Sequence, residues 1–184
     1  MNFVKDSVNQ QPIVDTVFTI VAKAKEAKEK YGADQVVDAT IGSLYNEEGQ
    51  LVALDSVFNS LKNLDNKVLA KYAASFTGNP TFRQKAYDWV LDGNSRLEHE
   101  VVATPGGTGA VSMTIQECLD EGQTVILPEI AWGSYALMAQ MHSLEMAKYS
   151  LFEGDHFNIA SFKETCLETM KKQNKLVIVI NDPC

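Results

Sequence analysis

The first candidate for chemistry is a glycine-rich stretch, TPGGTGAV at residues 104–111, between a predicted strand and a predicted helix. The first N–H groups of a helix have no partner inside it, and the helix dipole adds partial positive charge there. Gly106, Gly107 and Gly109 let a ligand approach closely, and the Thr108 hydroxyl adds a donor. The pattern predicts an anion site, with a tight turn that binds nothing as the alternative.

A dinucleotide is one ligand that this turn allows. Gly107 and Gly109 supply the first two glycines of the G-x-G-x-x-G pattern, and Glu129 follows at the end of the next predicted strand. Ser112 stands at the last position of that pattern, where glycine or alanine is expected, so the match to the pattern is incomplete. No Lys-Ser or Lys-Thr pair follows the glycines, which excludes a Walker A loop. A Rossmann-like nucleotide-binding domain therefore stays open as an alternative.

Alternating strands and helices are expected to position the turn. We predict strands over residues 100–104, 124–128, 145–151 and 175–181, with helices between them. The nearly continuous apolar run at 177–180 is typical of a strand buried on both faces. The pattern predicts an α/β fold with a mostly parallel sheet and helices on both faces, preceded by a helical N-terminal segment.

Helix start and stop signals divide that N-terminal segment. The first helix is expected to begin at Pro12 and end at Gly32, and apolar spacing predicts a second over residues 54–64. A third helix takes Asn79 as its N-cap and Pro80 as its first residue. Its predicted buried face consists of Phe82, Ala86, Trp89 and Val90, and the helix is predicted to end at Gly93.

Composition narrows the class of protein. The formal charge is −8, which disfavours nucleic acid as a partner. We expect no membrane span, since no run of 18 apolar residues occurs. The three cysteines, Cys118, Cys166 and Cys184, are widely spaced, so we expect no metal site and no disulfide framework. A reducing, cytoplasmic location fits this pattern.

Five segments in order give the chain a resemblance to a known family. They are VVDATIGSLYNEEG, KYAASFTGNPTFRQKAYDWVL, GGTGAV, AWGSY and LVIVINDPC. Together they resemble the class I/II aminotransferases, the fold type I pyridoxal-phosphate enzymes. The resemblance implies amino-acid and 2-oxo-acid substrates, a pyridoxal 5′-phosphate cofactor and a homodimer.

The same resemblance implies a role for each matching residue. Gly106, Gly107 and Thr108 would hold the cofactor phosphate through backbone N–H groups and the threonine hydroxyl. Trp132 would stack on the pyridine ring, which fixes the plane that the electron-sink chemistry needs. Tyr72 would reach the phosphate of the neighbouring subunit's cofactor.

The resemblance also bears on the substrate. Gly42 matches the position whose N–H faces the substrate carboxylate, with a plain turn glycine as the alternative. Ser134 and Tyr135 replace the Asn-His of aspartate-specific members, which leaves the amino donor open, aromatic amino acids included. Asn181 would lie behind the ring or cap the strand end.

No catalytic residue of the family falls within this chain. The lysine that forms the aldimine is expected beyond Cys184, as are the carboxylate for the pyridine nitrogen and the arginine for the substrate. We therefore expect an N-terminal portion, inactive alone and retaining at most weakly bound cofactor. Residues 1–50 would form the arm and the first part of the small domain, and 51–184 the first half of the large domain. A non-catalytic interaction fragment is the third possibility.

Overall fold

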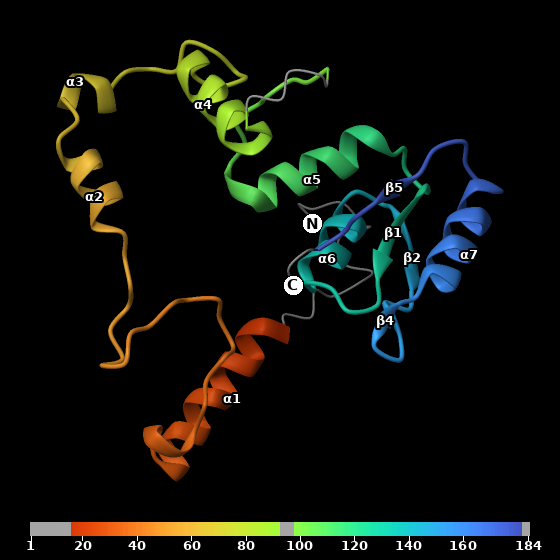
Figure 1. The fold of residues 1–184 in the computed structure, drawn as a ribbon, viewed down its shortest axis with the longest axis horizontal. Coiled ribbons are helices and arrows are strands. Elements are labelled where there is room, and N and C mark those ends of the chain that lie inside the picture. Colours follow the sequence, from red (N-terminus) through yellow and green to blue (C-terminus); the bar gives the residue numbers. More distant parts are fainter. Residues whose placement is uncertain (1–15, 93–97, 182–184) are drawn as a thin grey trace, which may run out of the picture. The chain divides into compact units, whose positions relative to one another are not determined.

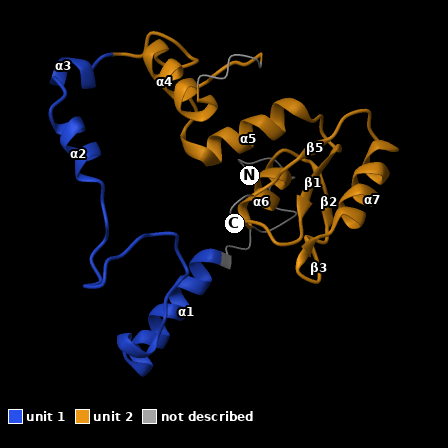
Figure 2. Ribbon diagram, in the orientation of Figure 1, with its two compact units in different colours: residues 1–71 blue, residues 72–184 orange. Residues whose placement is uncertain are grey.

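The computed structural model of the chain describes residues 16–92 and 98–181. The chain forms two compact units, Met1–Lys71 and Tyr72–Cys184 (Figure 2). The predicted boundary between small and large domain, at residues 50 and 51, is a different division. That boundary stays a prediction.

The first unit consists of helices joined by extended segments. α1 (Thr16–Tyr31) ends where Gly32 adopts φ +94°, and the Gly32 N–H donates to the Lys28 carbonyl at 3.0 Å. The predicted end of this helix is therefore confirmed, while its predicted start at Pro12 lies outside the described residues. The unit continues with η2 (Ala33–Gln35), α2 (Asp55–Lys62) and α3 (Asn66–Leu69).

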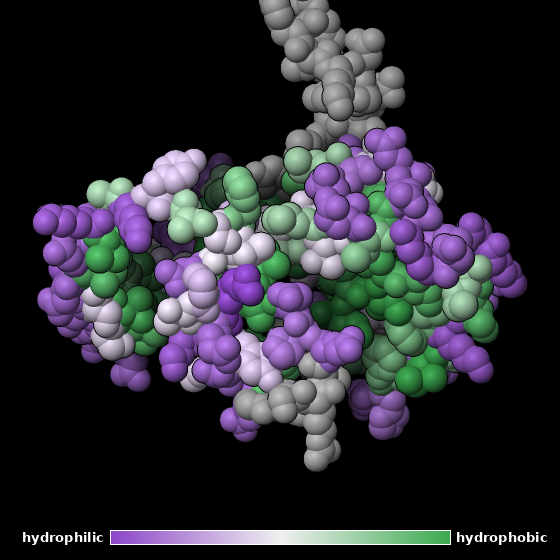
Figure 3. All heavy atoms as spheres, turned by 90° about the horizontal axis from the view of Figure 1, so that it is seen from above, coloured by the Kyte–Doolittle hydropathy of each residue, from purple (hydrophilic) through white to green (hydrophobic). Residues whose placement is uncertain are grey.

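Apolar side chains of the first unit stay open to solvent. No residue between 17 and 71 is buried. α2 forms where the apolar spacing predicts a helix, yet Val57 and Phe58 on its apolar stripe are exposed. Figure 3, which draws one face of the whole molecule, shows green apolar side chains among purple polar ones. Periodicity thus predicts the helix correctly without predicting its burial.

The second unit carries the sheet and most of the predicted site. Figure 1 shows its elements along the chain. They are α4 (Pro80–Leu91), α5 (Gly106–Cys118), β1 (Thr124–Pro128), α6 (Ser134–Met141), β2 (Glu145–Tyr149), β3 (Phe152–Glu153), β4 (His156–Phe157), α7 (Ile159–Met170) and β5 (Val177–Ile178).

β1 is the central strand of a three-stranded parallel sheet with the order β2-β1-β5. It pairs with β2 over its full length, while Val125 and Ile126 pair with Val177 and Ile178 of β5. The chain leaves β1 toward one side and crosses back to β5 on the other. Because such crossovers are right-handed, α6 and α7 lie on opposite faces of the sheet (Figure 1). The predicted α/β fold, with a parallel sheet and helices on both faces, is confirmed.

The buried core joins β1 to α5 and α6. Val125 and Leu127 of β1 are almost fully buried. Against them pack Ile115, Leu119, Tyr135, Met138, Ala139 and Leu144. Full burial of one aliphatic side chain stabilises the fold by about 1.5–3 kcal/mol, so this cluster fixes both helices to the same strand. The glycine turn before α5 and Trp132 before α6 are positioned by this core.

α4 begins as its sequence predicts. The Asn79 side chain accepts a hydrogen bond from the Thr81 N–H at 2.8 Å, and Pro80 is the first helical residue. An N-cap of this kind contributes about 0.5–2 kcal/mol to a helix. The predicted stop at Gly93 lies outside the described residues.

The predicted buried face of α4 is wrong. Phe82, Trp89 and Val90 are all exposed, and only Ala86 is half-buried. The spacing of these residues does put them on one stripe of the helix. Within the described residues, however, no element covers that stripe enough to bury it.

The predicted strand at 100–104 does not form a ladder. Its residues have no strand assignment, although the Ala103 N–H donates to the Thr77 carbonyl at 2.9 Å. Gly78 lies so close that a Cβ there would stand 2.6 Å from the Ala103 Cβ. The segment is therefore held by the loop before α4 and not by a neighbouring strand.

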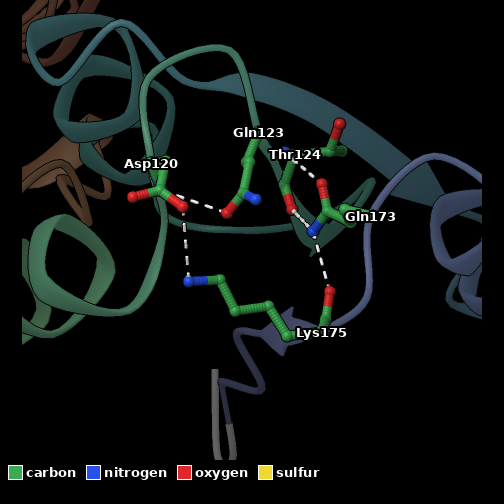
Figure 4. A network of polar contacts seen from close by, with 5 residues as sticks. All are labelled: Asp120, Gln123, Thr124, Gln173 and Lys175. Carbon is green, nitrogen blue, oxygen red and sulfur yellow. Dashed lines mark hydrogen bonds and ion pairs between the residues drawn. The ribbon is translucent and has the colours of Figure 1, made fainter.

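A polar network closes the N-terminal edge of the sheet (Figure 4). The Gln173 side-chain amide accepts from the Thr124 N–H at 2.8 Å and donates to the Thr124 carbonyl at 3.0 Å. It also donates to the Lys175 carbonyl at 2.9 Å. An exposed ion pair between Lys175 and Asp120, 3.7 Å long, lies beside it. The amide takes the place of a strand residue next to Thr124, one residue before β5 begins to pair with β1.

Candidate cofactor-binding site

The turn into α5 has a defined backbone geometry. Pro105 has φ −72° and ψ 78°, and the Gly106 N–H donates to the Thr104 carbonyl at 2.8 Å, which together form an inverse γ-turn. Gly106 itself has φ +70°, a conformation that glycine adopts without steric cost. The Thr104 hydroxyl donates to the Gly106 carbonyl at 3.0 Å. The Gly106 N–H thus has a partner inside the turn, and its predicted contact with a cofactor phosphate stays a prediction.

The first turn of α5 is open to a ligand. Pro105 occupies the N-cap position, no side chain caps the helix, and the first turn holds no acidic residue. Gly106, Gly107 and Thr108 are exposed. The N–H groups of Gly107 and Thr108 and the positive end of the helix dipole therefore face solvent, where an anion could bind.

The three glycines of this turn are under different structural constraints. A Cβ at Gly109 would lie 2.8 Å from the Pro105 Cδ, so close packing requires glycine there. Gly106 is required by its positive φ. A Cβ at Gly107 would meet no atom within 4 Å, and its φ lies outside the left-handed region. Neither packing nor backbone strain requires glycine at position 107.

Trp132, Tyr135 and Asn181 form one chain of contacts, which we call the aromatic–amide chain. The indole of Trp132 and the ring of Tyr135 lie edge to face, with centroids 5.5 Å apart and planes at 87°. The Tyr135 hydroxyl donates to the Asn181 Oδ1 at 2.8 Å. Tyr135 is buried, whereas Trp132 keeps 43% of its surface exposed. Trp132 therefore has accessible surface for a ligand and a buried neighbour that supports it.

The hydrogen bond of the aromatic–amide chain joins two residues that are 46 apart in sequence. Sequence reasoning singles out Tyr135 and Asn181 separately, the first within AWGSY and the second at the end of the last predicted strand. Their contact depends on β5 lying beside β1, with α6 packed on the sheet. The strand order had to be known before the two residues could be paired.

Glu129 has a role within the fold. Its carboxylate accepts hydrogen bonds from the Ser150 hydroxyl at 2.7 Å and from the Leu151 N–H at 3.1 Å. It fastens the loop after β2 to the end of β1. A dinucleotide site would need an acid at this place to bind a ribose. Glu129 already uses one carboxylate oxygen for both bonds, which disfavours the dinucleotide alternative.

Two further predicted site residues, Tyr72 and Gly42, are exposed. Tyr72 is 93% exposed at the start of the second unit. Gly42 lies in an exposed segment of the first unit, where a Cβ would meet no atom within 4 Å. Neither packing nor φ explains a glycine at that position. Their predicted roles, toward a neighbouring subunit and a substrate carboxylate, stay predictions.

Across residues 16–92 and 98–181, no group of three His, Cys, Asp or Glu side chains could hold a metal ion. Burial raises the pKa of the Tyr149 hydroxyl and of the Cys166 thiol, which lie on the β2 and α7 side of the sheet. None of the helices in these ranges is long and apolar enough to cross a membrane.

Solved structures of other proteins share this fold. An aminotransferase structure from Anaerococcus prevotii DSM 20548 is 31% identical, with a TM-score of 0.86 over 100% of this chain and 45% of that chain. Thermus thermophilus aspartate aminotransferase is 20% identical, with a TM-score of 0.72 over 100% of this chain and 46% of its own. The fold of the chain is that of these fold type I enzymes.

A protein that is similar in sequence is also an aminotransferase. The histidinol-phosphate aminotransferase of Sulfurisphaera tokodaii is 21% identical over 104 residues, which are 56% of this chain and 28% of that protein. The chain thus spans less than half the length of each of these three proteins. The family model for aminotransferases of class I and II matches residues 34–184. Since that match covers most of the 184 residues, the chain belongs to the class I and II aminotransferases.

Proposed function

We propose that this chain is the N-terminal, cofactor-binding part of an aminotransferase that uses pyridoxal 5′-phosphate. The whole enzyme would move an amino group between an L-amino acid and a 2-oxo acid, with pyridoxal phosphate as the group that accepts the amino group and gives it up again. It works as a homodimer in the cytoplasm, with Tyr72 of each subunit at the cofactor of the other. Residues 1–50 begin the small domain and 51–184 the large one. The amino donor stays open, because Ser134 and Tyr135 stand where aspartate-specific members have Asn-His.

The observation that carries this proposal is the open N-terminus of α5. Its exposed Gly107 and Thr108, the absence of a cap and the absence of acidic residues in its first turn suit a phosphate group. The Thr108 hydroxyl suits the same group. Trp132 offers an aromatic surface, which suits a flat pyridine ring. The donor set therefore fits a phosphorylated aromatic ligand.

Residues of this chain would bind and orient the cofactor without supplying the proton transfers. When bound, pyridoxal phosphate draws electrons away from the Cα of the amino acid. Gly107 and Thr108 would hold its phosphate, Trp132 would set the ring plane and Gly42 would face the substrate carboxylate. The resemblance to the family implies that the lysine that moves a proton at Cα lies beyond Cys184. We therefore expect the 184-residue chain to show no transamination above the rate of free cofactor, whichever donor is offered.

A binding experiment on the glycine turn tests the proposal. The probe is pyridoxamine 5′-phosphate, which has the ring and the phosphate but no aldehyde to react with surface lysines. We expect saturable binding to the wild-type chain. In Gly107→Ala the N–H groups of the helix terminus remain, so we expect affinity to fall, by at least about 5-fold, because the added Cβ would keep the phosphate from the close approach that glycine allows. The free energy of unfolding should stay equal or rise by about 0.5–1 kcal/mol in this variant, because alanine favours helix over glycine.

Two further variants serve as controls. Gln116→Ala changes an exposed residue later in α5 and should leave probe affinity unchanged. Gly109→Ala should lower stability, because the new Cβ would lie 2.8 Å from the Pro105 Cδ. Unchanged affinity in Gly107→Ala would show that the phosphate does not bind at this turn. Saturable binding of NAD without binding of the pyridoxamine probe would favour the nucleotide alternative.

A further inference from the structure

The glycine turn before α5 is held at one end by the core and at the other by the loop before α4. On the helix side, Ile115 and Leu119 of the segment that follows the turn are buried in the core. On the other side, the Ala103 N–H, two residues before Pro105, donates to the Thr77 carbonyl at 2.9 Å. The first turn of α5 between these two contacts is largely exposed. The direction in which the chain enters the turn therefore depends on the loop that holds Ala103.

Arg83 of α4 fastens that loop. Its Nη1 donates to the Thr77 Oγ1 at 2.9 Å, in a partly buried position. Its backbone N–H donates to the Asn79 carbonyl at 3.0 Å, so the side chain and the start of the helix hold the same loop. The Arg83 Nε is buried and has no hydrogen-bond partner among the described residues, so the contacts of the two Nη atoms fix the guanidinium.

Thr77 passes this contact on to the segment before the turn. Its hydroxyl accepts from Arg83, and its carbonyl accepts from the Ala103 N–H. One residue later, Gly78 has φ +98° and lies so close that a Cβ there would stand 2.6 Å from the Ala103 Cβ. A hydrogen bond from a charged donor is stronger than one between neutral groups. Because Arg83 fixes the Thr77 side chain to α4, it also fixes the carbonyl that holds Ala103.

The ion pair of Arg83 with Glu100 is the weaker of its two side-chain contacts. The Arg83 Nη2 and the Glu100 Oε2 are 3.8 Å apart, and the Glu100 side chain is 83% exposed. Exposed ion pairs contribute little, because water and salt screen them. The effect of Arg83 on the segment before the turn therefore passes mainly through Thr77.

We propose that Arg83 is a positioning residue for the glycine turn, which it aligns through Thr77 and Ala103 so that the N–H groups of Gly107 and Thr108 bind an anionic group. This inference rests on the proposed function, since the anionic group is the phosphate of the ligand. Arg83 itself does not contact the ligand. A turn without this contact must be ordered when the phosphate binds, and the entropy lost in ordering it lowers the affinity.

The affinity of the folded chain for inorganic phosphate and for pyridoxamine 5′-phosphate tests this role. Arg83→Met removes the guanidinium and keeps a side chain of similar width. It should weaken the binding of both probes by about 5- to 30-fold, the effect of ordering the backbone of one residue. The matched control is Lys85→Met, which removes the same charge from the same helix. The Lys85 side chain is 78% exposed and lies 3.9 Å from Asp88, so this variant should leave both affinities unchanged.

Two substitutions of Thr77 identify the route. Thr77→Val keeps the shape of the side chain and removes its hydroxyl, and it should weaken binding and abolish any further effect of Arg83→Met. Thr77→Ser keeps the hydroxyl and should bind both probes as the wild type does. The Thr77 hydroxyl also lies 2.9 Å from the Ser75 hydroxyl, so the double-mutant cycle is needed to isolate the part that belongs to Arg83.

Nuclear magnetic resonance of the ligand-free chain separates positioning from a merely structural role. In Arg83→Met and Thr77→Val, the Ala103 amide should exchange its hydrogen faster, and the amide signals of the first turn of α5 should shift. Lys85→Met should show neither change. A merely structural role would lower the melting temperature of Arg83→Met and leave the affinity of its folded molecules at the wild-type value.

The outcomes distinguish this inference from the proposed function. If the wild-type chain binds neither probe saturably, the proposed function fails, and this inference with it. If the wild type binds and Arg83→Met binds equally well, the positioning role alone is refuted. Additive losses of affinity in the double-mutant cycle would refute it as well. If Arg83→Met does not fold, the two Thr77 variants decide, and equal affinities of Thr77→Val and Thr77→Ser would refute the role.

Discussion

Replacing Gln173 by methionine should destabilise the second unit strongly. Gln173 is 9% exposed, and its amide bonds the N–H and carbonyl of Thr124 and the carbonyl of Lys175 (Figure 4). Methionine has a similar length and no branch, so it fills the space without pairing any of these groups. The change leaves three backbone groups of a partly buried edge without their partner.

The structure gives the expected size of the effect. An unsatisfied buried polar group costs about 1–3 kcal/mol, and water can reach part of this edge, so we take about 1 kcal/mol for each group. Gln173→Met should then lower the free energy of unfolding by about 3 kcal/mol, a large share of the 5–15 kcal/mol typical of a domain. Lys175→Ala removes only the exposed ion pair with Asp120 and should cost less than about 1 kcal/mol.

Two measurements check this prediction. Urea unfolding followed by circular dichroism should give a lower midpoint at an unchanged slope for Gln173→Met and nearly the wild-type curve for Lys175→Ala. Hydrogen exchange should show faster exchange of the Thr124 amide in the methionine variant only. Equal unfolding curves for the two variants, with the Thr124 amide still protected, would refute the assignment of Gln173 as a substitute strand residue.

Two further predictions concern a carboxylate of the first unit and the candidate site. The 2.7 Å hydrogen bond from Lys28, with further bonds from Thr40, lowers the pKa of Asp38 from 3.8 to about 2. Because the folded pKa is depressed, this pair stabilises the fold above pH 3.8 and stops doing so as pH falls through about 2. Carboxyl NMR titration of Lys28→Met should show the pKa of Asp38 rising toward 3.8 while that of Asp34, lowered by Gln35, stays low. Trp132→Ala should lower the affinity for the probe, and it should lower cofactor retention and turnover in the whole enzyme. Because Trp132 is 43% exposed, the variant should stay folded. A strongly lowered melting temperature with unchanged affinity would instead show that Trp132 is a core residue.

Local signals in the sequence determined the elements of this protein. Asn79 and Pro80 begin α4, and Gly32 ends α1, because caps and φ preferences act within a few residues. The apolar run at 124–128 is β1 at the predicted bounds. The turn before α5 and its open N-terminus follow from the order of proline, glycines and threonine. The family resemblance was likewise readable from short motifs in a fixed order.

Burial and pairing were decided by the tertiary structure. The apolar stripe of α4 and the extended segment at 100–104 have sequences suited to burial and to a ladder, but both depend on a neighbour that periodicity does not name. The hydrogen bond between Tyr135 and Asn181 likewise depends on β5 lying beside β1. The Gln173 amide can bond Thr124 because β5 begins to pair with β1 only at the next residue, Val125. Caps and turns are set by contacts a few residues apart, whereas burial and side-chain pairing join distant segments. The sequence by itself therefore determined the helices, the turns and the central strand, whereas the packing of these elements determined which distant residues are in contact.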